Sequence, residues 1–302
     1  MKVRVLGSAA GGGFPQWNCR CPVCALAWNG DARVTPRTQS SVAVSADGDH
    51  WFLLNASPDL KQQILANAPM RPRGHGRHSP IAGVVMTNAD VDHVGGLLTL
   101  RERQSLVLYG TERVLATLTA NPIFTVLDAS VVERRVMALD QPMMLHLPGG
   151  VPSGLTLEAF AVPGKQALWL EDKPGSREDT IGLLLRDGDG VSLAYIPACA
   201  AITEAVRQRV AGAALLLFDG TLWQDDEMIT AGVGSKTGAR MGHVSISGAN
   251  GALAGWKDAD VRRKLFIHIN NTNPVLIDGS PERNAVLDAG WGITEDGQEF
   301  TL

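Results

Sequence analysis

One polar segment carries the residues of this chain best suited to bind a metal ion. It reads Thr87-Asn88-Ala89-Asp90-Val91-Asp92-His93-Val94-Gly95-Gly96-Leu97 and follows an apolar run at residues 81–86. Loops after buried strands place their side chains at the edge of a sheet, where the positive end of a following helix favours carboxylates. We therefore expect Asp92 and His93 to face a metal site. Asp90 is either a further ligand or only the cap of the following helix.

Three of the four cysteines crowd into a second segment, Cys19-Arg20-Cys21-Pro22-Val23-Cys24. Thiolates at this spacing on a tight loop can face a common centre, which suits a tetrahedral zinc ion whose fourth ligand comes from elsewhere. In a reducing compartment such a cluster is more often metal-binding than disulfide-forming. We expect a structural Zn²⁺ site at Cys19, Cys21 and Cys24, and the alternative is three buried thiols in a turn of the core.

Two further residues have the chemistry of a catalytic site. Asp219 ends an apolar run and precedes Gly220, a combination that commonly places a carboxylate at the mouth of a sheet. It is a candidate for binding substrate or metal, and the alternative is a turn residue. His243 is a candidate general acid or base, because an imidazole titrates near neutral pH.

Apolar runs of strand length alternate with segments of helical period, which predicts an α/β fold. Strands are expected at residues 2–6, 41–46, 51–55, 81–86, 106–109, 156–162, 180–186, 192–196, 215–218 and 264–269, and helices at residues 58–68 and 94–104. Long surface loops are expected at residues 71–79 and 223–240. The simplest arrangement of these elements is a single domain, residues 1–302, in which two sheets pack together with helices outside.

Composition excludes some classes of function. The net charge is −4 over 302 residues and the arginines are dispersed, so no basic field is available to hold a nucleic acid. No run approaches the roughly 18 apolar residues of a membrane-spanning helix. The first residues lack the apolar core of a secretory signal. We therefore expect a cytoplasmic protein with neither a nucleic-acid nor a membrane partner.

The polar segment resembles the metallo-β-lactamase signature HxHxDH, with Asp92 and His93 at the positions of its last two ligands. That resemblance implies a four-layer αββα sandwich. Asn88 and Asp90 stand where the family has histidines, and residues 161–179 contain no replacement histidine. A C-terminal histidine of the family is matched by His268. Two histidines and one carboxylate are the ligands of the facial triad that holds non-haem Fe(II), whereas hydrolysis at two metals would need the missing donors.

A closer resemblance extends over the whole chain. The sequence is similar to the coenzyme PQQ synthesis protein B family in its segments Gly76-Arg77-His78-Ser79-Pro80-Ile81, Leu217-Phe218-Asp219-Gly220-Thr221-Leu222-Trp223, Met241-Gly242-His243 and His268-Ile269-Asn270-Asn271-Thr272-Asn273-Pro274. The resemblance implies a role in making pyrroloquinoline quinone (PQQ) from a peptide-derived glutamate-tyrosine precursor, in partnership with other proteins of the pathway.

The resemblance leaves open the activity of the protein and the fourth ligand of the zinc site. The leading hypothesis is an oxygenase whose Fe²⁺, held by Asp92, His93 and His268, supports hydroxylation of the tyrosine ring. The alternatives are a carrier that helps to transport PQQ or its precursor, and a metal-dependent hydrolase. Related proteins with an N-terminal CxCxxC close their zinc site with a residue near the last strand, which here is Asn271 or His268 itself. The end-of-strand position favours the catalytic site for His268.

Overall fold

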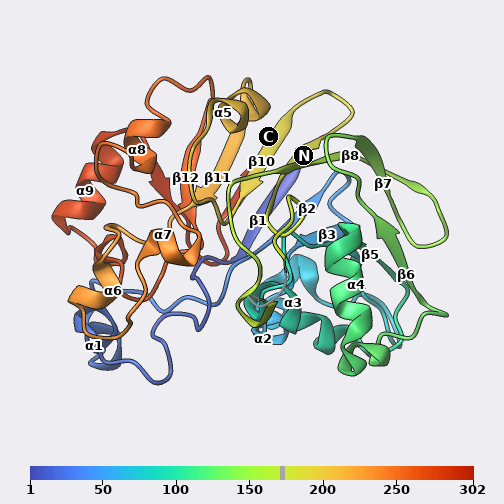
Figure 1. Ribbon diagram of the computed structural model, residues 1–302. Helices are drawn as coiled ribbons and strands as arrows, with labels where there is room; N and C mark the ends of the chain where they lie inside the picture. Colours follow the sequence, from blue (N-terminus) through green and yellow to red (C-terminus); the bar gives the residue numbers. More distant parts are fainter. Residues whose placement is uncertain (171–173) are drawn as a thin grey trace.

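The computed structural model describes residues 1–170 and 174–302, and in it two seven-stranded sheets pack face to face with helices on their outer faces (Figure 1). In the first sheet the strands lie in the order β14-β1-β2-β3-β4-β5-β6. Their bounds are β1 Lys2–Gly7, β2 Ser41–Ser45, β3 Trp51–Leu54, β4 Ile81–Val85, β5 Leu106–Gly110, β6 Val132–Val136 and β14 Glu299–Thr301. Strands β3 to β6 run parallel, and β14, β1, β2 and β3 pair antiparallel.

The second sheet repeats this mixture of directions in the order β13-β12-β11-β10-β9-β8-β7. Its strands are β7 Pro142–His146, β8 Pro152–Ala161, β9 Ile181–Arg186, β10 Ser192–Ile196, β11 Leu215–Asp219, β12 Lys264–Ile267 and β13 Gly292–Ile293. Strands β10 to β13 run parallel, while β7 to β10 pair antiparallel. Each sheet therefore has a block of parallel strands whose carboxyl ends share one edge, which is where loops can assemble a site.

Short helices cover the outer faces. They are α1 Pro22–Trp28, α2 Leu60–Ala66, α3 Val91–Val94, α4 Glu112–Ala120, α5 Glu204–Val210, α6 Glu227–Thr230, α7 Gly238–Met241, α8 Ala252–Gly255 and α9 Pro281–Asp288. Turns of 3₁₀ helix occur at Ala68–Met70, Gly95–Leu100, Pro122–Val126, Leu168–Leu170 and Pro274–Leu276. None of the helices described is both long and apolar enough to cross a membrane.

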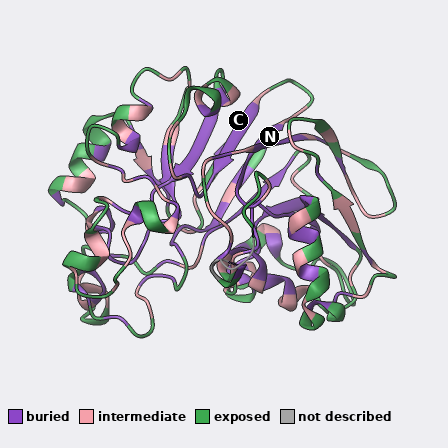
Figure 2. Ribbon diagram, in the orientation of Figure 1, coloured by how far each residue is buried: buried purple, intermediate pink, exposed green. Residues whose placement is uncertain are grey.

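Three apolar layers hold these elements together, and Figure 2 shows buried strands inside and exposed helix faces outside. The middle layer lies between the sheets and includes Phe52 and Leu217. Leu60 and Leu118 belong to the layer between the first sheet and its helices, and Trp256 belongs to the layer on the outer side of the second sheet. The α/β class and the four-layer arrangement expected from the sequence are confirmed.

The prediction of a helix at residues 94–104 is wrong. Helix α3 begins earlier, at Val91, and gives way after Val94 to the 3₁₀ turn Gly95–Leu100. The cause is a close backbone contact: the Gly96 N–H donates to the carbonyl of Ala56 at 2.9 Å, and a Cβ on Gly96 would lie 2.1 Å from the carbonyl oxygen of Ser57. The expected loop at residues 223–240 also contains helix α6 and the first residues of α7.

Candidate metal centre

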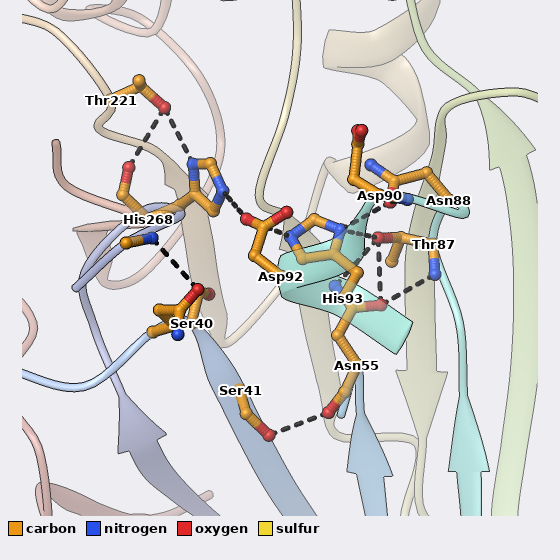
Figure 3. Close-up of polar contacts among 12 residues, drawn as sticks. Ser40, Ser41, Asn55, Thr87, Asn88, Asp90, Asp92, His93, Thr221 and His268 are labelled. Atoms are coloured by element: carbon orange, nitrogen blue, oxygen red, sulfur yellow. Dashed lines mark hydrogen bonds and ion pairs between the residues drawn. The ribbon is translucent and has the colours of Figure 1, made fainter. Parts of the chain in front are cut away.

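Three side chains from the two sheets meet at one point. Asp92 and His93 lie on α3, which follows β4 of the first sheet, and His268 directly follows β12 of the second. Asp92 Oδ2 lies 3.1 Å from His268 Nε2 and 3.7 Å from His93 Nε2. Figure 3 shows the Asp92 carboxylate between the two imidazoles. Donor atoms of the three residues lie within 4.8 Å of one another.

The tautomer of His93 is set by Asn88. The backbone N–H of Asp90 donates to Asn88 Oδ1 at 3.0 Å, so this atom of the amide is its oxygen. The same oxygen lies 2.7 Å from His93 Nδ1, and because an amide oxygen can only accept, Nδ1 carries the proton. Nε2 then presents a lone pair.

That lone pair has no hydrogen-bond partner, although His93 Nε2 is fully buried. Burial lowers the pKa of His93 to about 4, so the imidazole is neutral at neutral pH. A buried polar atom without a partner is costly and calls for an explanation such as a bound ion. Donors on one ion at bonds of about 2.1 Å lie roughly 3 to 3.5 Å from each other, which is close to the separations around Asp92 Oδ2. The three residues therefore fit a metal ion.

The pKa shifts of Asp92 and His268 also favour a bound cation. Burial raises the pKa of Asp92, but the neighbouring imidazoles of His93 and His268 outweigh it and hold the pKa below its usual range. For His268, burial lowers the pKa, but the hydrogen bond and charge of Asp92 outweigh it and raise the pKa above its usual value. The carboxylate is thus ionised where a cation would bind.

His268 occupies a constrained position. Its backbone has φ +60°, a left-handed conformation that is uncommon outside glycine. Its Nδ1 lies 2.9 Å from the hydroxyl oxygen of Thr221, while Nε2 faces Asp92. The ring is therefore held from both sides.

Asp90 lies at the rim of this group. It lines the adjoining cavity and is the N-cap residue of α3, although its side chain makes no capping hydrogen bond there. It is not among the three residues whose donor atoms converge.

Asp219 and His243 form a second group that touches the first. Asp219 ends β11 and is completely buried, and His243 Nδ1 lies 2.7 Å from its Oδ2. The His243 ring stacks on that of His268, with centroids 5.4 Å apart and planes 20° from parallel. His243 lines the cavity, whereas Asp219 lies behind it.

The cavity beside these groups has a volume of about 420 Å³. Asn88, Asp92, His93, Thr221, His243 and His268 form its polar wall. Two lysines, Lys165 and Lys236, and two methionines, Met228 and Met241, also line it. Its size is that of a site for a small molecule.

The three cysteines form a separate cluster. Cys19, Cys21 and Cys24 are buried, none is in a disulfide, and their sulfur atoms lie within 4.8 Å of one another. Asn271 joins them: its Nδ2 lies 3.1 Å from Cys19 Sγ and 3.2 Å from Cys24 Sγ. His268 does not join them. Of the two residues considered for the fourth ligand position, Asn271 lies at the cysteines and His268 lies with Asp92.

Two polar residues beside the metal-binding group carry functions that sequence reasoning did not assign. Asn88 was considered only as a replacement for a ligand, yet it orients His93. Thr221 was not singled out, yet it contacts Asp219, His243 and His268. The sequence carries a signal for both, because each lies shortly after a buried parallel strand that leads to the site.

The role of Asn88 can be tested by removing its amide. We expect Asn88→Ala to weaken anaerobic Fe(II) binding about 10- to 100-fold, because His93 loses the acceptor that orients it. Asn88→Asp, which keeps an acceptor oxygen, should bind close to the wild type. Competition with a chelator measures the affinity, and equal affinities for wild type and Asn88→Ala would contradict this role.

Comparison with known proteins identifies the family and the fold. A beta-lactamase superfamily domain model matches residues 50–269. Coenzyme PQQ synthesis protein B of Methylorubrum extorquens strain PA1 is 54% identical over 306 residues, covering all of both chains. The protein of the same name from Rhodopseudomonas palustris strain TIE-1 is 54% identical over 309 residues, again covering all of both.

Solved structures support the same family and fold. The crystal structure of Zn²⁺-bound PqqB from Methylobacterium extorquens has a TM-score of 0.94 and 53% identity and covers all of both chains. A diphosphatase of the PhnP family has a TM-score of 0.70 at 20% identity, with 99% of this chain and 96% of that chain covered, which shows the shared fold alone. The family and fold expected from the sequence are thereby confirmed, and the chain belongs to the coenzyme PQQ synthesis protein B family, with a metallo-β-lactamase fold.

Proposed function

We propose that this chain is an iron-dependent oxygenase of PQQ biosynthesis that hydroxylates the tyrosine ring of a peptide-derived glutamate-tyrosine precursor. The observation that carries the proposal is the meeting of Asp92, His93 and His268 beside a cavity, with the lone pair of a buried imidazole unpartnered. Two imidazoles and one carboxylate are typical of non-haem Fe(II) oxygenases, because the set leaves positions open. The names of the relatives supply the pathway.

The residues of the chain prepare this site before any ion binds. Bound Fe(II) would supply the activation of dioxygen that ring hydroxylation requires. Asn88 holds His93 with Nε2 toward the centre, and Asp92 provides the negative charge that favours a cation there. The ligand set is therefore already oriented, and a bound metal would displace the proton that His268 Nε2 donates to Asp92 Oδ2.

In the proposed reaction His243 accepts a proton from the phenol of the substrate. Its Nδ1–H donates to Asp219 Oδ2, so its Nε2 carries the lone pair. In the proposed step the phenol O–H bond breaks, its proton forms a new N–H bond at His243 Nε2, and the electron pair stays on the oxygen. Asp219 stabilises the resulting imidazolium. Phenolate formation makes the ring more electron-rich and easier to hydroxylate.

The cavity also suits the rest of such a substrate. Lys165 and Lys236 line its wall beside Asp90 and Asp92, and a lysine ammonium group can donate to a carboxylate of a ligand. Met228 and Met241 provide apolar, adaptable surface for an aromatic ring.

The cysteine cluster is proposed to hold a structural Zn²⁺ through Cys19, Cys21, Cys24 and Asn271. The hydrogen bond between Cys21 and Cys24 lowers the pKa of Cys24 and, together with burial, raises the pKa of Cys21, so Cys24 ionises first and zinc would displace the proton of Cys21. The crystal structure of Zn²⁺-bound PqqB from Methylobacterium extorquens supports the choice of zinc.

The hydrolase alternative has less support. Hydrolysis at two metals needs a second set of donors about 3.5 to 4 Å away. The nearest second group is Asp219, His243 and His268, but it shares His268 with the first, and both oxygens of Asp219 already accept hydrogen bonds from the protein.

Oxygen consumption tests the proposal. Anaerobic reconstitution with Fe(II), followed by addition of oxygen and a peptide-derived substrate with a glutamate-linked tyrosine, should give substrate-dependent oxygen uptake and a ring-hydroxylated product. His93→Ala should reduce uptake to background, and His75→Ala, at an exposed histidine, should leave it unchanged. Uptake by the wild type no greater than that of His93→Ala would defeat the oxygenase. Zinc as the sole bound metal would then favour a carrier, and two metals beyond it a hydrolase.

The role of His243 is tested separately from metal binding. His243→Gln should bind Fe(II) as the wild type does but hydroxylate about 100-fold more slowly, because the proton acceptor is lost. Single-turnover measurements on metal-loaded protein separate the two effects. A wild-type rate in this variant would remove His243 from the mechanism.

A further inference from the structure

We propose that Thr221 is a positioning residue whose hydroxyl fixes the tautomer of His268 for metal binding and joins it to the Asp219–His243 pair. The inference rests on the metal site of the proposed function. It concerns a residue outside the converging ligands, held at the end of β11 beside the cavity.

The hydrogen bonds of Asp219 determine which way the hydroxyl points. Asp219 is completely buried, and a buried carboxylate requires donors on both of its oxygens. Oδ2 accepts from the Cys199 backbone N–H at 2.9 Å and from His243 Nδ1 at 2.7 Å. Oδ1 accepts from the Thr221 backbone N–H at 3.0 Å and from the Thr221 hydroxyl at 2.7 Å. The hydroxyl oxygen also lies 3.0 Å from the carbonyl oxygen of His268, a second possible acceptor. The shorter distance and the negative charge of the carboxylate favour Asp219 as the acceptor of the one hydroxyl proton.

The lone pairs of the same hydroxyl then face His268. A neutral histidine whose Nε2 binds a metal carries its only ring proton on Nδ1. The nearest acceptor for that proton is the Thr221 oxygen, 2.9 Å from His268 Nδ1. Donation from His268 to Thr221 to Asp219 forms one continuous chain, and His243 donates to the same carboxylate from the other side.

This chain of hydrogen bonds explains why Asp219, His243 and His268 do not form a second cation site. Both oxygens of Asp219 are occupied by protein donors. His268 Nε2 faces Asp92 and donates to its Oδ2 at 3.1 Å, and a metal bound there would take the place of that proton. A second ion would have to displace the Thr221 hydroxyl and the ring proton of His243. The group instead orients two imidazoles at once.

The two histidines of the metal site are oriented in the same way. Asn88, shortly after β4, accepts from His93 Nδ1, and Thr221, shortly after β11, accepts from His268 Nδ1. Figure 3 shows the two acceptors on opposite sides of the Asp92 carboxylate. In each sheet a short polar side chain at the end of a parallel strand thus aims one imidazole at the common centre.

The test uses Co(II) in place of iron, in protein whose cysteine site holds zinc. A histidine ligand of Co(II) gives a shifted proton resonance for its Nδ1–H, which is visible only if exchange with water is slow. We expect two such signals in the wild type, one for each histidine. Thr221→Val, which keeps the shape but removes the hydroxyl, should lose the His268 signal and weaken Co(II) binding about 10- to 100-fold. Thr221→Ser should restore both.

Two results would overturn the inference. One is a Thr221→Val protein that keeps the His268 signal and binds Co(II) as tightly as the wild type. The other needs no variant: in zinc-loaded wild type with ¹⁵N-labelled histidine, long-range ¹H–¹⁵N correlations that place the proton of His268 elsewhere than on Nδ1. Neither readout depends on oxygen uptake, so the inference can fail while the oxygenase survives, and the reverse also holds.

Discussion

The contact of the Asp92 carboxylate with His93 and His268 is the interaction on which the site depends. His93 belongs to helix α3, which follows β4 of the first sheet, and His268 directly follows β12 of the second, so one carboxylate joins the two halves of the fold. Withdrawing a carboxylate from water is costly unless opposite charge and hydrogen bonds compensate. The packing of the two sheets must therefore position the two imidazoles beside the carboxylate. A cation bound between the imidazoles would offset the remaining free-energy cost of withdrawing the carboxylate from water.

The loops around this contact are tied to one another. His268 and Asn271 lie three residues apart on the loop after β12, so one loop serves both the candidate catalytic centre and the cysteine cluster. The N-terminal loop crosses the same region, where the Ala10 N–H donates to the carbonyl of Ile269 at 2.8 Å. A zinc ion at the cysteines would thus fasten the loop that carries His268.

Local patterns could be predicted from the sequence, and long-range partners could not. The spacing of Cys19, Cys21 and Cys24 and the adjacency of Asp92 and His93 are local, so they stood out. His268 and Asn271 follow only from the family resemblance, because nothing local relates His268 to Asp92, 176 positions away, or Asn271 to Cys19, 252 positions away. The false helix at residues 94–104 had the right apolar period, but the contact of Gly96 with the turn after β3 is a tertiary constraint. Asn88 and Thr221 resemble ordinary turn residues until their partners are placed.

Anomalous diffraction at the iron edge, from crystals loaded with Fe(II) under anaerobic conditions, tests the central claim most directly. The account predicts an iron peak within about 2.3 Å of Asp92 Oδ2, His93 Nε2 and His268 Nε2, and none at the cysteines. Iron bound elsewhere, or the three atoms turned away from a common point, would contradict it.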